Sequence, residues 1–399
     1  MIAPDLLARL RAGEHAVWRR PGPCATTPGI GDAELDDVRA RLRRFQPLLA
    51  EVFANGWDGR IASALDAYHP AGLPPLLVKR DDALPMTGSI KARGGVYELL
   101  CAVEDFARHA GVLGNDYRSL LSPAAKAALA AERVVVASTG NLGFSVGLVG
   151  SALGVHVEVH MSHDAKAWKK DRLRAVGATV IEHAGDYHAA VVHARVAAAA
   201  NGAYFVDDEN SPRLFAGYAA AADEVAEQLA ERGVTPTAAR PLVAYLPCGV
   251  GGAPGGVLAG LKRRWGEAVI GVFVEPVASP CLLVALATGG DAPVSVYDVG
   301  LDNRTIADGL AVPLASPLVL ARIGGAVAAA VAVPDAALKH WVKRVWQDCG
   351  WRLEPSAAAG FAALDPLLAA WPELAEAHHL IWTTGGAMLP DAEFHAYFA

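Results

Sequence analysis

The sequence predicts an α/β protein built on two parallel sheets. Short β-branched segments alternate with helical patterns from residue 133 onward, which indicates strand–helix–strand units. The alternation restarts at Leu242, so a second sheet is expected there. Apolar residues make up 53% of the 399 positions and charged residues 19%, which is enough to bury the core of one large or two ordinary domains.

Residues 1–70 are mostly helical in pattern, with an amphipathic helix over Asp36–Leu49, and Leu76–Lys79 is a short apolar strand. The first sheet is expected to contain the strands Arg133–Ser138, Val155–Met161, Thr179–Glu182 and Ala203–Val206, with a helix at Asp164–Val176. The second sheet is expected to contain the strands Leu242–Leu246, Val269–Val274 and His379–Trp382.

Composition and charge argue against several classes of function. The 42 aspartates and glutamates outnumber the 35 lysines and arginines, and a net charge of −7 is the wrong sign for a protein whose main partner is nucleic acid. The most apolar long stretch, 311–334, contains Arg322 and three prolines, which makes it a poor membrane span. The N-terminus lacks the apolar run of a signal peptide, and the five scattered cysteines form no CxxC pair. These features predict a cytoplasmic protein with reduced thiols.

Four loops follow predicted strands or turns and could carry chemistry. They are Thr87–Gly95, Ser138–Gly143, Cys248–Gly256 and Thr383–Ala387. In an open α/β sheet, ligands bind beyond the carboxyl ends of the strands, where such loops meet.

The first loop places Lys91 among small residues at the expected start of a helix. A lysine beside a helix N-terminus is unfavourable as a cation, and Schiff-base chemistry supplies a reason for it, because the amine attacks a carbonyl in its neutral form. The alternative is a solvent-exposed lysine, which is what a lone lysine more often is.

The second and third loops are rich in glycine and small polar residues. Ser138–Gly143 is equally consistent with an amide nest for a carboxylate and with a capped tight turn. Cys248–Gly256 favours an anion held by main-chain amides, although it is neither a Walker loop nor a GxGxxG fingerprint. The histidines lack metalloprotease spacing, and no Gly-x-Ser-x-Gly elbow is present.

Taken together, these segments resemble the fold type II pyridoxal-phosphate enzymes, and most closely their D-serine dehydratase branch. The resemblance covers about residues 80 to 390. It is carried by Leu84–Gly95, Ser138–Gly143, Val159–Ser162, Ala167–Lys170, Leu246–Gly252, Ser279–Cys281, Asp302–Asn303, Ala307–Leu310 and Thr384–Gly386. The segments Ala167–Lys170, Pro247–Gly252 and Ser279–Cys281 narrow the resemblance to the D-serine branch.

The resemblance implies a fold like that of the tryptophan synthase β subunit, with the active site between two parallel-sheet domains. A large cofactor-binding domain would comprise residues 1–95 and 212–399, including the helical segment 1–70, and a smaller substrate-side domain would comprise 96–211. The implied activity is β-elimination of water from D-serine, with D-threonine as a further candidate substrate, to give pyruvate (or the corresponding keto acid) and ammonia. The assembly would be a monomer or a homodimer.

The resemblance also implies roles for single residues. Lys91 would carry pyridoxal 5′-phosphate as a Schiff base and move the Cα proton, while Thr139 and Asp208 would assist catalysis near the substrate. The cofactor would be held by Lys91, Asn141, Gly249, Val250, Gly251, Gly252, Ala253 and Thr384. The substrate carboxylate would be received by Ser138, Thr139 and Leu142. Glu275 would help to bind a monovalent cation, K⁺ or Na⁺.

Three departures from the family pattern and three alternatives remain. Asp82 and Ala83 stand where the family usually has a polar pair. Ala253 and Ala387 stand where glycines are expected, and Ala253 fits the phosphate loop only if its φ is negative. A threonine dehydratase or a β-replacement enzyme on the same fold is the nearest alternative activity. A non-catalytic protein that binds the cofactor or an amino acid is an alternative from another class.

Overall fold

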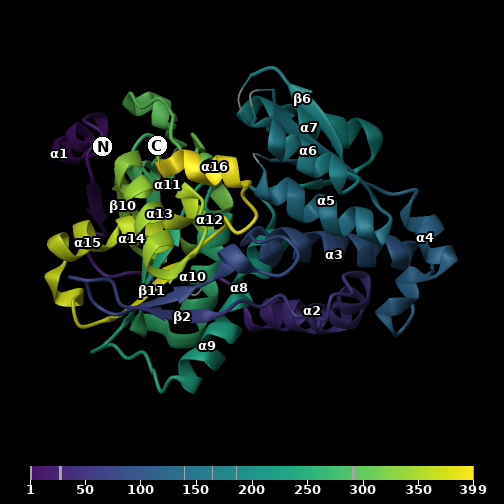
Figure 1. Cartoon of the computed structure of the whole chain (residues 1–399), viewed down its shortest axis with the longest axis horizontal. Coiled ribbons are helices and arrows are strands. Elements are labelled where there is room, and N and C mark those ends of the chain that lie inside the picture. Colours follow the sequence, from purple (N-terminus) through teal and green to yellow (C-terminus); the bar gives the residue numbers. More distant parts are fainter. Residues whose placement is uncertain are drawn as a thin grey trace.

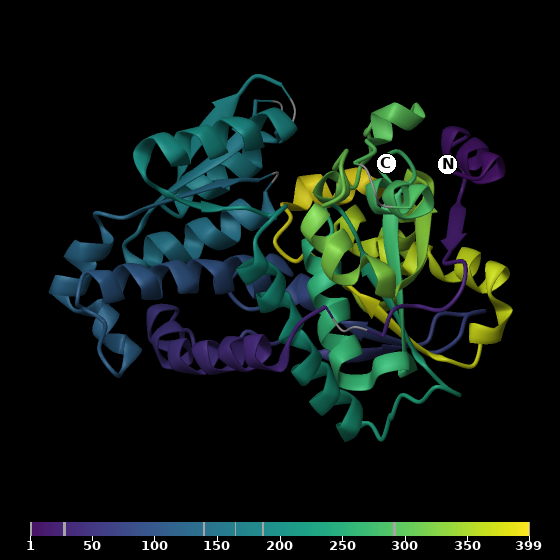
Figure 2. The ribbon, with the colours of Figure 1, turned by 180° about the vertical axis from the view of Figure 1, so that it is seen from behind.

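The computed structural model describes residues 2–26, 29–138, 140–163, 165–185, 187–289 and 293–398, and of residue 188 only the backbone. It folds into two lobes side by side, with the small lobe formed by the teal central part of the chain (Figure 1). The view from behind shows the same division (Figure 2).

Each lobe contains one sheet. The sheet of the large lobe has the strand order β1 (Ala16–Arg19), β10 (Val327–Val333), β9 (Val269–Pro276), β8 (Leu242–Pro247), β11 (His378–Trp382), β3 (Leu76–Lys79) and β2 (Leu65–Tyr68). The sheet of the small lobe has the order β6 (Thr179–His183), β5 (His156–Ser162), β4 (Arg133–Ala137) and β7 (Tyr204–Val206). The predicted strands are therefore confirmed, within one or two residues at their ends.

The helices pack around and between these sheets. They are α1 (Pro4–Arg11), α2 (Asp32–Val52), α3 (Lys91–His109), α4 (Pro123–Leu129), α5 (Asn141–Leu153), α6 (Ala167–Ala175), α7 (Tyr187–Asn201), α8 (Pro212–Ala219), α9 (Ala221–Glu231), α10 (Gly252–Trp265), α11 (Cys281–Thr288), α12 (Pro317–Ile323), α13 (Asp335–Cys349), α14 (Pro355–Ala362), α15 (Leu364–Ala370) and α16 (Asp391–His395). The long helix α3 packs against α5 of the small lobe and α8 of the large lobe, and thereby joins them.

Alternate residues of the central strands face opposite layers of helices. Along β8, Leu242 and Ala244 belong to the core cluster shared with α10, whereas Val243 lies in the cluster shared with α13 and α14. All of β8 is buried. Because a strand covered on both faces needs apolar side chains on both, its sequence is a continuous apolar run, and the sequence of β8 has this pattern.

The parallel-sheet prediction is wrong at both edges of the large sheet. β1 runs antiparallel to β10 and β2 runs antiparallel to β3, while the strands of the small sheet are all parallel. Both edge strands lie within 1–70, so that segment is less helical than predicted. Each is only four residues long, which is too short for its alternation to stand out from the flanking helices.

The limits of the two predicted domains remain a prediction. The small sheet lies wholly within 96–211, and the strands of the large sheet lie outside it.

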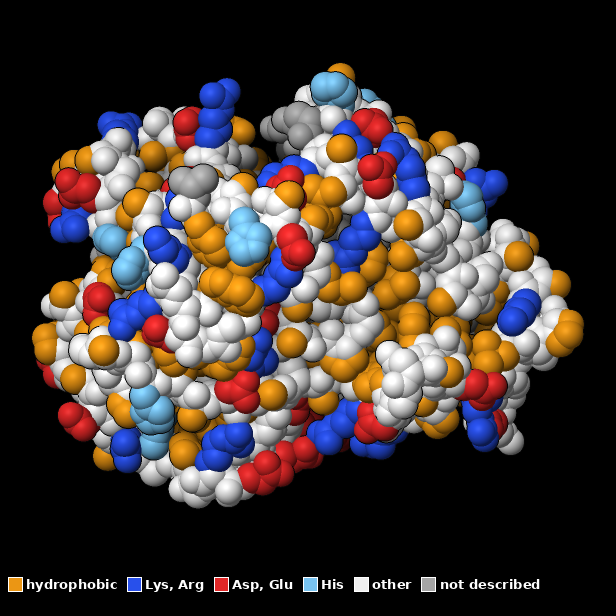
Figure 3. Space-filling model, viewed as in Figure 1, with side chains coloured by type: hydrophobic (Ala, Val, Ile, Leu, Met, Phe, Trp, Pro, Cys, Tyr) orange, Lys and Arg blue, Asp and Glu red, His pale blue; other side chains and the backbone are white. Residues whose placement is uncertain are grey.

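On the face shown in Figure 3, acidic and basic side chains are interspersed instead of gathered in one basic patch. No helix in the described ranges has the length and apolar character that a membrane crossing requires. The five cysteines are all unpaired.

Candidate active site

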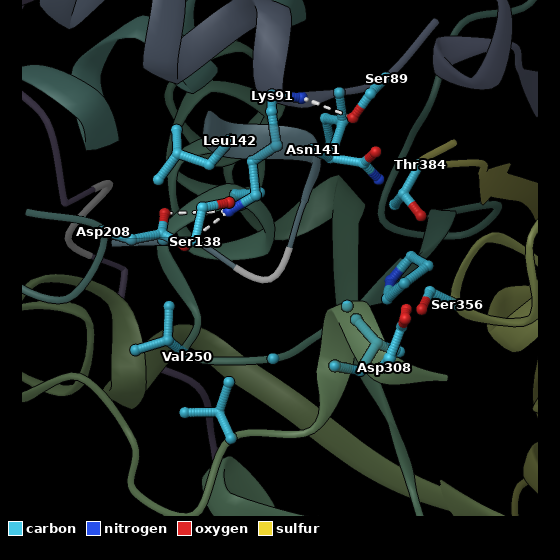
Figure 4. Close-up of a pocket in the computed structure, with 18 of the residues that line it drawn as sticks. Ser89, Lys91, Ser138, Asn141, Leu142, Asp208, Val250, Asp308, Ser356 and Thr384 are labelled. Atoms are coloured by element: carbon cyan, nitrogen blue, oxygen red, sulfur yellow. Dashed lines mark hydrogen bonds and ion pairs between the residues drawn. The ribbon is translucent and has the colours of Figure 1, made fainter. Parts of the chain in front are cut away.

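A cavity lies where the two lobes meet, and the space between its atoms, including the part open to solvent, is about 780 Å³ (Figure 4). Loops that follow β4, β7, β8 and β11 open onto it, which is the ligand-binding edge of α/β sheets. The lining residues are Ser89, Ile90, Lys91, Ser138, Asn141, Leu142, Lys169, Tyr187, Asp208, Pro247, Gly249, Val250, Gly251, Gly252, Ala253, Pro254, Asp308, Gly309, Leu310, Val312, Glu354, Ser356 and Thr384. The four loops selected from the sequence therefore each contribute to one cavity.

Lys91 is the first residue of α3, and its side chain extends into the cavity toward Asp208 (Figure 4). Its Nζ lies 2.7 Å from Asp208 Oδ2 and 2.9 Å from Oδ1. The side chains are only 19% and 13% exposed, so this ion pair is largely shielded from water. Two residues chosen 117 positions apart in the sequence are thus within proton-transfer distance.

The loop Ser138–Gly143 forms the small-lobe wall of the cavity. The buried Ser138 hydroxyl oxygen accepts hydrogen bonds from the amides of Gly140 and Gly143, at 3.0 and 2.9 Å. Helix α5 begins directly after Gly140, and Leu142 lines the cavity in its first turn. The loop thus presents a hydroxyl and a helix N-terminus to the cavity. Thr139 lies outside the described residues.

The glycine-rich loop after β8 leads into the N-terminus of α10. Gly251 has φ +110°, a conformation that favours glycine, and Gly252 begins the helix. Ala253 lies within α10, and the described non-glycine residues with positive φ are Met86 and Asn303. The alanine in place of a family glycine is therefore accommodated, because its φ is negative. The amides at this helix start favour an anion.

Asn141 faces an acid that the sequence did not indicate. Its Nδ2 donates to Glu354 Oε1 at 3.0 Å and to Oε2 at 3.3 Å, across 213 positions of the chain. Burial raises the pKa of Glu354 to about 7, with a further increase from nearby Asp308. Glu354 directly precedes Pro355, the first residue of α14. An acid before a proline at a helix start is the sequence pattern that could have indicated Glu354.

Thr384 and Ser356 share a different property. Both hydroxyls are buried. Among the described side chains that line the cavity, their oxygens are the buried polar atoms without a hydrogen-bond partner. Gly386 has φ +136°, and a Cβ there would lie 2.4 Å from the Glu354 amide, so the loop after β11 requires glycine. Ala387, like Ala253, has no positive φ.

Glu275 does not line the cavity. It lies at the end of β9, fully buried, and its carboxylate accepts hydrogen bonds at 2.8 Å from the amides of Leu282 and Leu283 at the start of α11. Burial raises its pKa to about 8. No group of three or more histidine, cysteine or acidic side chains in the described ranges could hold a metal ion. Cation binding by Glu275 therefore stays a prediction.

Outside the four loops, five lining residues with polar side chains were given no role from the sequence. They are Lys169, Tyr187, Asp308, Glu354 and Ser356. Lys169 and Asp308 lie in segments that carried the family resemblance, whereas the other three gave no motif.

Comparisons with known proteins show the family of the chain. Residues 63–385, most of the chain, match the family described as pyridoxal-phosphate dependent enzyme. The chain belongs to this family. The match begins just before β2 and ends at Gly385, so it includes the first three loops of the cavity and the first three residues of the fourth, Thr384 among them.

Relatives cover the full length of the chain. It is 48% identical to a probable D-serine dehydratase of Burkholderia thailandensis, over 100% of this chain and 94% of that protein. It is 45% identical to proteins of the same description from Cupriavidus pinatubonensis, over 100% of this chain and 95% of the relative, and Pseudomonas paraeruginosa, over 98% and 94%.

Solved structures share the fold at low sequence identity. Diaminopropionate ammonia lyase of Escherichia coli in complex with D-serine has a TM-score of 0.76 at 20% identity, covering 96% of both chains. Threonine deaminase isoform 2 of Solanum lycopersicum has a TM-score of 0.67 at 20% identity, covering 95% of this chain and 97% of that one. The fold type II prediction is therefore confirmed.

The cavity fits pyridoxal phosphate. A primary amine (Lys91), a helix N-terminus behind a glycine loop, and two unpartnered buried hydroxyls line the same space. These groups match an aldehyde, a phosphate and a heteroaromatic ring with polar atoms on its edge.

Replacing Thr384 by valine tests this fit. Because a buried hydroxyl without a partner costs about 1–3 kcal/mol, the cofactor-free variant is expected to be at least as stable as the wild type. Loss of one hydrogen bond should weaken cofactor binding by about 3- to 10-fold. Thermal unfolding without cofactor and equilibrium dialysis with it measure the two effects.

The adjacent threonine provides the control. Thr383 is also buried, but its hydroxyl donates to the Lys79 carbonyl at 2.7 Å, so Thr383→Val should destabilise the protein with or without cofactor. A Thr384→Val variant that behaves like Thr383→Val would contradict the assignment.

Glu354 predicts a pH dependence of stability. Its folded-state pKa of about 7 lies above the ordinary value of 4.5, so its contribution to stability is complete below pH 4.5 and is lost as the pH rises through 7. Glu354→Gln should remove this loss, which is roughly 3 kcal/mol for such a shift. Urea unfolding of the cofactor-loaded protein at pH 5 and pH 8 measures it.

The wild type should therefore lose more stability between these two pH values than the Glu354→Gln variant. Glu373→Gln, at an exposed position, is the control and should keep the wild-type profile. Parallel profiles for wild type and Glu354→Gln would contradict the prediction.

Proposed function

We propose that this protein is a pyridoxal-phosphate-dependent D-serine dehydratase, which converts D-serine to pyruvate and ammonia, with D-threonine as a further substrate. The observation that carries the proposal is the 45–48% identity, over nearly the whole chain, to proteins described as probable D-serine dehydratases. The contact between Lys91 and Asp208 supports it, because β-elimination needs a base at Cα and a proton for the leaving hydroxyl.

The residues of the cavity divide the work of binding. Gly249, Val250, Gly251, Gly252 and Ala253 would hold the cofactor's phosphate at the start of α10. Asn141 would donate to the ring hydroxyl, and Thr384 would face the ring nitrogen. Ser138, Thr139 and Leu142 would receive the substrate's carboxylate at the start of α5. Each assignment is supported by a lining position, except that of Thr139.

The bound cofactor supplies a conjugated ring that takes up the electron pair left at Cα. Lys91 would remove the Cα proton through its Nζ. Asp208, at 2.7 Å from this nitrogen, would orient it and, with Thr139, lie near the departing Cβ hydroxyl. The proton from Cα and the hydroxyl from Cβ leave as water. Hydrolysis of the released enamine then adds water and expels ammonia, which leaves pyruvate.

A monovalent cation at Glu275 completes the proposal. The buried carboxylate of Glu275 is adjacent to Cys281. Burial, and after it the charge of Glu275, raises the pKa of the Cys248 thiol that precedes the phosphate loop, so a cation at Glu275 would act next to that loop. Activity that is unchanged when K⁺ and Na⁺ are both replaced by a bulky organic cation would contradict this part.

Product analysis distinguishes the proposal from its rivals. A dehydratase releases pyruvate from D-serine whether or not sulfide is present. A β-replacement enzyme would instead incorporate sulfide into cysteine, and a threonine dehydratase would prefer L-threonine. Cofactor binding without turnover of any of these amino acids would favour the non-catalytic alternative.

A further inference from the structure

A lysine of the small lobe reaches across the cavity to the large lobe. Lys169, on α6, lines the cavity with a side chain only 12% exposed, and its Nζ lies 2.6 Å from Asp308 Oδ2. Asp308 begins the short 3₁₀ helix Asp308–Leu310 of the large lobe and also lines the cavity (Figure 4). The ion pair therefore joins the lobes at the site itself.

The same lysine lies against the first turn of α5. A Cβ added to Gly140 would lie 3.0 Å from Lys169 Cδ and 3.3 Å from both Cε and Nζ. The glycine therefore lets the lysine approach the loop that the proposed function assigns to the substrate's carboxylate. A cation beside a helix N-terminus is unfavourable unless an anion lies between them.

The charges of the cavity also favour a substrate carboxylate beside Lys169. The described lining residues include three acids (Asp208, Asp308 and Glu354) and two cations, Lys91 and Lys169. An amino-acid carboxylate that enters such a cavity meets repulsion unless a cation compensates for it. The proposed function assigns Lys91 to the cofactor and to the Cα proton of the substrate. Of the two cations, Lys169 is therefore the one that compensates for the carboxylate.

Arg172, one turn along α6, is not an alternative partner. Its guanidinium lies 3.5 Å from the centroid of the Phe144 ring, and Arg172 does not line the cavity.

We propose that Lys169 binds the substrate's α-carboxylate and exchanges Asp308 for it when substrate enters the cavity. This inference rests on the proposed function, because it assumes an amino-acid substrate. It makes Lys169 a specificity determinant for carboxylate-bearing substrates, supplied by the small lobe.

Three substitutions separate this role from that of a bridge between lobes. Lys169→Met is expected to raise KM for D-serine at least about 10-fold and to change kcat by only a few-fold. The cofactor content, measured by the visible absorbance of the cofactor, should be unchanged. Lys169→Arg should recover part of the affinity. Asp308→Asn should leave KM unchanged or lower it, because it removes the competing carboxylate.

Other results would overturn the inference. If Lys169 acts only as a bridge, Lys169→Met and Asp308→Asn will raise KM equally. An unchanged KM in Lys169→Met, or a fall in kcat alone, also contradicts carboxylate binding.

The wild type is assayed first, which keeps the two proposals distinct. Wild-type pyruvate formation with an unaffected KM in Lys169→Met rejects the inference and leaves the proposed function intact. If the wild type forms no pyruvate, the proposed function falls, and the dissociation constant of D-serine from the cofactor's absorbance change replaces KM. No binding of D-serine by the wild type would reject both.

Discussion

Replacing Lys91 by alanine is expected to abolish turnover of D-serine. The variant loses the amine that would anchor the cofactor and the base that would move the Cα proton, and base catalysis alone contributes about 10²- to 10⁴-fold. We expect activity to fall by at least about 10⁴-fold and the visible absorbance of the lysine-linked cofactor to disappear. Pyruvate formation and the absorption spectrum measure the two effects.

A surface lysine provides the matched control for this variant. Lys343 is exposed on α13, remote from the cavity, and Lys343→Ala should keep wild-type activity and spectrum. Wild-type turnover in the Lys91→Ala variant would contradict the assignment of Lys91.

Replacing Asp81 by alanine is expected to cause the largest loss of stability. Asp81 is fully buried and accepts two hydrogen bonds from Arg93, both at 2.7 Å, and a third from Trp382 Nε1 at 2.8 Å. Its removal leaves the buried Arg93 with Glu224 as its remaining ion-pair partner, at 2.9 Å. Breaking a buried ion pair from one side costs about 3–5 kcal/mol.

The effect should also reach the active site. Arg93 lies two residues after Lys91 on α3, and Trp382 lies two residues before Thr384, so this cluster fixes the start of both cofactor loops. Urea unfolding of the Asp81→Ala variant, with its cofactor content, measures the two consequences.

An ion pair with an exposed carboxylate provides the comparison. Asp37 pairs with Arg41 at 2.6 Å, one turn along α2, and its side chain is 55% exposed. Asp37→Ala should therefore cost less than about 1 kcal/mol. An Asp81→Ala variant no less stable than Asp37→Ala would contradict the structural role of the cluster.

The sequence predicts what depends on local pattern. The strands β3, β8 and β9 have apolar runs of the right length and end in turn residues, so their positions and the loops after them follow from the chain alone. The family resemblance then places Lys91, Asn141 and Thr384 in one site, and all three line the cavity.

The sequence does not predict what depends on packing across the chain. β10 is an unbroken apolar run that is buried on both faces, and it lies in the stretch considered only as a membrane span. Glu354 and Asn141 are 213 positions apart, and Lys169 and Asp308 are 139 apart. Such pairs meet only because the lobes close on each other, so no local pattern marks them.

The most direct test is to add D-serine and L-serine separately to the purified protein, while recording its visible spectrum and assaying pyruvate. The account predicts an absorbance band of the lysine-linked cofactor and pyruvate from D-serine alone. Pyruvate from L-serine alone, or a band without pyruvate from either, would contradict the proposed substrate. The absence of any band after addition of pyridoxal phosphate would contradict the assignment of the cavity itself.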